Sequence, residues 1–168
     1  IFNYIRFKTG EDYKKLYSKI FNDKVKIEHS ILYGETSRLV ENGNGHQNIS
    51  ATRFDYLRIA KAIMDDYQNE TCVGKYLKEI HERRIKKNIK RGDEPDFNFS
   101  YSYGGQFHFD YPGLKNKVIF GLGGFGGQAI LIDMENSRIV VLNSVHYNND
   151  KYKYNVKKLL IDPIKKGK

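Results

Sequence analysis

The chain of 168 residues has the length of one domain, enough to bury a core without cross-links. Its single cysteine, Cys72, excludes an internal disulfide framework and a cysteine-rich zinc site. Hydrophobic residues form 39% of the chain, and its apolar runs are too short to span a bilayer, while the net charge of +9 makes a polyanionic partner worth weighing.

Residues 1–95 are expected to be mainly helical. Apolar side chains at helical spacing predict a short helix from Glu11 to Phe21, and the stretch from Ile27 to Tyr33 has an extended, strand-like pattern. A Gly- and Asn-rich loop is predicted from Glu41 to Asn48.

Two longer helices are predicted next. Thr52 followed by Asp55 resembles a capping box, and the residues after it predict a helix from Arg53 to Tyr67 with one buried face. Thr71 is expected to open a second helix that ends near Arg91. This helix is expected to turn its basic residues outward and to bury Val73, Leu77 and Ile80.

Basic residues are concentrated on the second of these helices. Eight Lys and Arg residues lie between Lys75 and Arg91, against Glu79 and Glu82, and His81 is expected on the same basic face. A run of this kind is usually a solvated helix face, and the alternative is a site for nucleic acid or an anionic surface. A second basic cluster closes the chain at residues 165–168.

The pattern changes from helical to strand-like after Pro95, and a turn is predicted from Asp93 to Asp96. Aromatic residues alternate with polar ones as in a half-buried strand, and their close spacing to later strands favours antiparallel pairing. A terminal helix is predicted from Lys151 to Ile161, so the fold class is α+β. The alternating aromatic residues and the later strands are Phe97, Phe99, Tyr101 and Tyr103, then Lys117–Phe120, Gln128–Asp133 and Arg138–Asn143.

Five glycines occupy the seven positions from Gly121 to Gly127, between two predicted strands. Glycines let the backbone approach a ligand, so that free N–H groups face an oxyanion, although a bulge or tight hairpin gives the same pattern. A phosphate-binding loop is disfavoured because no Gly-Lys-Ser/Thr follows and the next element is a strand.

The five histidines show no metal-binding spacing, so neither a metal nor another cofactor is predicted. His46 and His108 are candidates to line a cleft, but a lone histidine on the surface is the simpler interpretation. His29 and His146 carry no assigned role.

Several segments resemble one family in the family's own order. Gly123 to Ser144 resembles the last active-site motif and following strands of the serine β-lactamase-related superfamily, which includes class C β-lactamases, penicillin-binding DD-peptidases, esterases and amidases. Tyr101 to Phe107 is similar to the preceding strand, and Asn44 to Arg58 resembles the family's Gly-rich loop and following helix. Thr9 to Phe21 matches an earlier helix, so the similarity covers most of the chain.

The resemblance implies that 1–168 is one domain, and an incomplete one. It would be the C-terminal part of a β-lactamase/DD-peptidase-like fold, with residues 1–95 mainly helical and residues 96–168 forming a three- to four-stranded antiparallel meander and a terminal helix. It also implies a serine hydrolase that forms an acyl-enzyme on an amide or ester, with a small-molecule or peptide substrate and no cofactor.

The resemblance also locates the chemistry. The family's Ser-x-x-Lys nucleophile motif is absent from this chain, so the nucleophile and the Lys or Tyr base are expected before Ile1, and the isolated chain is expected to be inactive. Gly121-Leu122-Gly123 takes the place of the family's basic third motif, which makes an ester, amide or peptide as credible a substrate as a β-lactam. The oxyanion N–H is expected at Gly124, and the remaining substrate-binding positions are Gly121, Leu122, Gly123, Phe125 and Gly126.

Two other hypotheses remain. One is a noncatalytic binding module that uses the basic helix on an acidic partner, and the other is a degenerate family member. The resemblance implies a periplasmic or cell-envelope location, and no specific nucleic-acid partner is expected.

Overall fold

In the computed structural model, residues 2–29, 31–35, 47–88, 100–114, 116–124, 128–143 and 156–167 are described. The chain divides into two compact units, residues 1–59 and residues 60–168. The division falls inside a helix, not at residue 95, where the sequence pattern changes. None of the helices in the described ranges combines the length and apolar character needed to cross a membrane.

The first unit begins with a series of short helical segments. These are α1 (Phe2–Thr9), the 3₁₀ turn η1 (Gly10–Asp12), α2 (Tyr13–Ser18) and the π-helical segment η2 (Lys19–Lys24). The prediction of one helix from Glu11 to Phe21 was therefore only partly right. Gly10 has a φ of +57°, which interrupts the helix, and Leu16 and Ile20 stay 38% and 39% exposed.

A small antiparallel hairpin follows in the first unit. It pairs β1 (Leu32–Glu35) with β2 (Gln47–Ser50), and Tyr33 lies opposite Ile49. The extended stretch predicted from Ile27 to Tyr33 overlaps only the start of β1. Of the loop predicted from Glu41 to Asn48, the last two residues belong to β2, and the others lie outside the described residues.

Both predicted long helices are present. The first, α3 (Arg53–Gln68), has its predicted start, and α4 (Cys72–Glu82) is capped by Thr71, whose hydroxyl accepts a hydrogen bond from the Gly74 N–H at 3.1 Å. The expectation that this second helix continues to Arg91 was wrong. The chain turns after Glu82 because β3 (Ile85–Lys86) pairs with β4 and joins the sheet.

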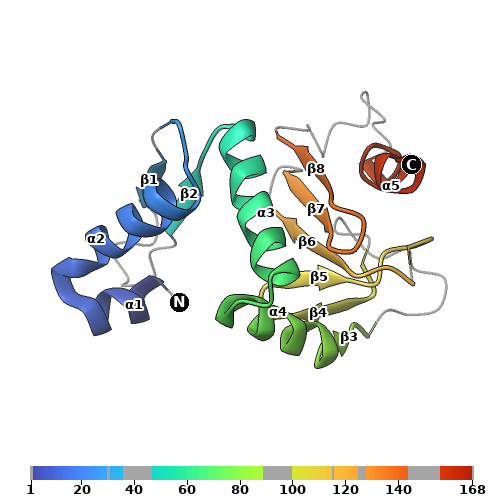
Figure 1. Cartoon of the computed structure of the whole chain (residues 1–168), viewed down its shortest axis with the longest axis horizontal. Coiled ribbons are helices and arrows are strands. Elements are labelled where there is room, and N and C mark those ends of the chain that lie inside the picture. The colour runs from blue at the N-terminus through green and yellow to red at the C-terminus, as the bar shows by residue number, and fades with distance from the viewer. Residues whose placement is uncertain are drawn as a thin grey trace. The chain divides into compact units, whose positions relative to one another are not determined.

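The second unit is built on a six-stranded antiparallel sheet whose spatial order is the chain order, β3 to β8 (Figure 1). The α+β class is confirmed, but the sheet has more strands than the three or four expected. The additional strands are short, and one hairpin turns at Gly105 and Gln106, both with positive φ. The five strands that follow β3 are β4 (Ser102–Gly104), β5 (Phe107–Phe109), β6 (Ile119–Gly123), β7 (Ala129–Asp133) and β8 (Arg138–Leu142).

Each face of this sheet is covered by helix. On one face, α5 (Val156–Lys166) buries Leu160, Ile161 and Ile164 against a cluster that includes Ile119 and Leu131. On the other face, Phe120 and neighbouring aromatic rings pack against α4 (Figure 1). The side chains of β6 therefore alternate between two cores, as a strand inside a layered domain requires.

The terminal helix runs further than predicted. It was expected to end at Ile161, before Pro163, yet α5 continues to Lys166 because Ile164 is fully buried in the cluster on the sheet. Residues 151–155, where the predicted helix began, lie outside the described residues, as do the predicted turn at 93–96 and the aromatic positions 97 and 99.

Candidate functional site

The glycine-rich segment forms the β6–β7 hairpin. Gly121 and Gly123 are paired with Leu131 and Ala129, so the first half of the segment belongs to a regular strand. Beyond the strand, the Gly124 N–H donates a hydrogen bond of 2.9 Å to the backbone oxygen of Gln128. Phe125 and Gly126, which were also predicted site residues, lie outside the described residues.

This hydrogen bond determines where the other N–H groups of β6 point. In an antiparallel pair, the hydrogen-bonded positions alternate along each strand. Because Gly124 faces Gln128, Leu122 is the next position bonded to β7, and the Gly123 N–H points to the opposite edge. Gly124 therefore has its N–H engaged inside the hairpin, whereas Gly123 is exposed.

The outer edge of β6 is open at Gly123 on the described residues. There β5 pairs with β6 at His108 and Gly121, and β5 begins at Phe107, so Gly123 lies beyond this pairing. A backbone donor at such an edge can hydrogen-bond an anionic oxygen of a ligand.

Gly121 has a separate structural reason to be glycine. A Cβ atom at this position would lie 1.7 Å from the hydroxyl oxygen of Tyr111, which is 3% exposed. The aromatic side chain therefore lies directly on the backbone of β6, and the glycine is required by this close approach.

His108 is the predicted cleft residue that the structure brings to this region. It lies opposite Gly121, on the same face of the sheet. Its Nδ1 lies 3.2 Å from the Ser100 hydroxyl and 3.2 Å from the Lys87 ammonium nitrogen, while Lys87 donates to Ser100 at 2.6 Å. Burial and the neighbouring Lys87 charge lower the pKa of His108 to about 4, so the imidazole is neutral at pH 7.

The Lys87–Ser100–His108 cluster has the groups of a nucleophile and its base. Ser100, however, is fully buried, so a substrate has no access to its hydroxyl in this arrangement. The sequence gave little warning of the cluster, because its three residues come from separate segments and share no motif spacing. Lys87 had been counted only as part of the basic run.

His81 is not on the basic face where it was expected. Its ring lies 5.4 Å from that of Phe109 and 5.9 Å from that of Phe120, on the sheet side of α4. Burial is the main cause that lowers the pKa of His81, with Arg84 adding to it. The histidine is therefore a core residue, which helical spacing from Leu77 could have indicated.

Several residues of the basic run are paired with acidic groups. Lys78 pairs with Glu70 and Arg83 with Glu79, and the Arg84 guanidinium binds both oxygens of Asp110 at 2.9 and 3.1 Å. Val73, expected to face inward, is 45% exposed. These ion pairs reduce the charge that the run offers to a polyanion.

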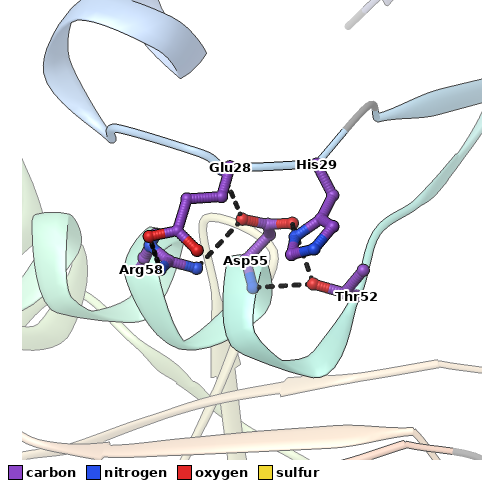
Figure 2. Close-up of polar contacts among 5 residues, drawn as sticks. All are labelled: Glu28, His29, Thr52, Asp55 and Arg58. Atoms are coloured by element: carbon purple, nitrogen blue, oxygen red, sulfur yellow. Dashed lines mark hydrogen bonds and ion pairs between the residues drawn. The ribbon is translucent and has the colours of Figure 1, made fainter.

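The first unit contains a second polar cluster, centred on Asp55 (Figure 2). The Asp55 carboxylate accepts hydrogen bonds from the Thr52 hydroxyl at 2.8 Å and the Glu28 N–H at 2.9 Å, and from Arg58 at 3.2 Å. Thr52 in turn accepts from the Asp55 N–H at 3.2 Å, which confirms the predicted cap.

Asp55 is completely buried at the start of α3, and Arg58 also pairs with Glu28. Burial opposes ionisation, but the hydrogen bonds from Glu28, Thr52 and His29 hold the pKa of the Asp55 carboxyl below its usual value. The cluster thereby fastens the connector at residues 28–29 to the helix.

His29 completes this cluster. Its Nδ1 lies 3.1 Å from the Asp55 carboxylate, and its side chain is 55% exposed. Because an ionised carboxylate only accepts, Nδ1 is the donor and Nε2 is the remaining basic atom. This pairing orients the ring, but the described residues around it supply neither a nucleophile nor a set of metal ligands. No group of three or more His, Cys, Asp or Glu residues able to hold a metal is found anywhere in the described ranges.

Comparison with known proteins gives no relative for this chain. No protein-family model, curated protein or solved structure matches it.

Proposed function

We propose that this chain is the C-terminal part of a serine hydrolase of the β-lactamase-related type, and that it supplies the oxyanion strand of the active site. The reaction would be acyl transfer from an amide or ester to a serine outside these 168 residues, followed by hydrolysis. The observation that carries the proposal is Gly123, an exposed strand residue whose N–H points away from β7.

Two further features support this proposal. The Gly-rich hairpin connects two central strands of an antiparallel sheet that has a C-terminal helix on one face, which agrees with the order of the resemblance. The engaged N–H of Gly124 also transfers the donor role expected at that residue to Gly123. An oxyanion donor must have its N–H free when the substrate arrives.

The test is single-turnover acylation of the full-length protein by a serine-directed fluorophosphonate probe and by p-nitrophenyl acetate. Gly123→Pro removes the donor and should lower the acylation rate about 100- to 1,000-fold. Gly123→Ala keeps the N–H and serves as the matched control, with a much smaller loss.

Thermal melts of both variants separate misfolding from lost chemistry. A well-folded Gly123→Pro variant with normal acylation would reject Gly123 as the donor. The isolated 168-residue chain should show neither labelling nor turnover, and stoichiometric labelling of one of its own serines would place the active site elsewhere.

The alternative of a noncatalytic module with a basic helix gains no support from the geometry. Lys78, Arg83 and Arg84 are each committed to an ion pair within the unit.

A further inference from the structure

One side-chain atom beside the glycine hairpin is buried without a partner. Oε1 of Gln128 is inaccessible and has no hydrogen-bond donor, the one buried side-chain oxygen or nitrogen of this kind within the described part of the chain. Buried acceptors are normally satisfied, because leaving one unpaired is costly. An exception of this kind therefore calls for an explanation.

The position of this oxygen is set by Gly124. A Cβ atom on Gly124 would lie only 3.1 Å from Oε1, so the absence of a side chain there makes room for the amide. The backbone of the same two residues is joined by the hydrogen bond from the Gly124 N–H to the Gln128 oxygen. The amide is thus held at the base of the hairpin, beside Gly123.

The rest of the Gln128 side chain is only half-buried. The terminal torsion of a glutamine is broad, so a small rotation can turn Oε1 toward a ligand without a change of backbone. The outward N–H of Gly123 and this acceptor then present one donor and one acceptor a short distance apart.

We infer that Gln128 is a specificity-determining residue of this hairpin, whose side-chain oxygen accepts a hydrogen bond from an N–H group beside the reacting carbonyl of the substrate. The inference rests on the proposed function. It narrows the substrate class to acyl donors that carry an amide N–H, such as N-acylated amino acid esters and amides. A site with a buried acceptor discriminates strongly against analogues that lack the donor, because the acceptor is then left unpaired.

The experiment uses two p-nitrophenyl esters that differ in one group. The N-acetylglycine ester carries the N–H, and the levulinate ester has a CH₂ in its place. Single-turnover release of nitrophenolate is measured on the full-length protein, and each rate is divided by that of the uncatalysed hydrolysis. The wild-type protein should prefer the N-acetylglycine ester by about tenfold or more.

Three variants assign this preference to the side-chain oxygen. Gln128→Met removes the acceptor at similar size, and should slow only the N-acetylglycine ester and abolish the preference. Gln128→Glu keeps a side-chain oxygen and should retain it. Gly124→Ala should weaken the preference, because its Cβ displaces the amide.

The outcomes separate the two hypotheses. Equal acylation by both esters in the wild-type protein, or a preference that survives Gln128→Met, would overturn the role of Gln128 while leaving the hydrolase proposal intact. Acylation by neither ester would overturn the hydrolase proposal itself. Thermal melts add an independent readout, since loss of an unpaired acceptor in Gln128→Met should not lower the melting temperature, whereas a marked loss would indicate a structural hydrogen bond instead.

Discussion

The ammonium nitrogen of Lys87 lies 3.2 Å from Nδ1 of His108, so protonation of the histidine would place two positive charges in contact. With its pKa lowered from 6.5 to about 4, His108 binds a proton more weakly in the folded than in the unfolded chain. Folding stability from this group is therefore complete above about pH 6.5 and is lost as the pH falls toward 4.

The first prediction is that the free energy of unfolding falls by about 1–3 kcal/mol over this interval, after allowance for solvent screening. His108→Gln cannot titrate and should flatten the dependence. Urea unfolding at several pH values from 4 to 8 measures it, with Lys87→Met as a second variant that should reduce the slope. An unchanged slope in His108→Gln would show that other groups cause the acid sensitivity.

The second prediction concerns Asp55, the one residue classed as buried in the described part of the first unit. Asp55→Ala should destabilise this unit by about 2–4 kcal/mol, since it leaves Arg58 and two other donors without their acceptor. Asp65→Ala on the same helix is the matched control. That residue forms a partly exposed ion pair with Lys61, and its loss should cost under about 1 kcal/mol. Equal losses in denaturant melts would argue against the cluster as the anchor of the connector.

The third prediction tests the contact between Gly121 and Tyr111. Gly121→Ala should destabilise the second unit by more than about 3 kcal/mol, because the new methyl group meets the tyrosine ring in a packed core. Gly104→Ala is a suitable comparison in the same sheet, since its nearest atoms would be 3.4 Å away. Circular dichroism melts compare the two variants, and a stable Gly121→Ala protein would contradict the described packing.

The fourth prediction concerns nucleic acid. Any binding of DNA should be weak and should disappear between about 50 and 200 mM salt, because only nonspecific phosphate contacts are available. Fluorescence anisotropy with two unrelated duplexes measures this. Submicromolar, sequence-selective binding at physiological salt would favour the binding-module hypothesis over the hydrolase.

The sequence predicted the elements whose signals are local. Thr52 with Asp55, and Thr71 before α4, are caps that act within one turn, and both were recognised. The strands around Ile130 and Val140 were also recognised, because a short apolar run between turn residues is typical of a buried strand.

The parts that escaped prediction depend on contacts between distant segments. Nothing near Ile85 in the sequence indicates a strand, because β3 exists through its pairing with Tyr103. The donor expected at Gly124 was reassigned for a related reason. A glycine pattern reveals where the backbone is unobstructed, but the direction of each N–H depends on the register with β7.

The order of the strands from β3 to β8 has a consequence for how the second unit folds. Each strand pairs with the next one along the chain, so every pairing step closes a short loop at low entropic cost. Contacts between residues near in sequence are associated with fast folding. The sheet can therefore assemble hairpin by hairpin as the ribosome releases it, and only the docking of α5 must wait for the end of the chain.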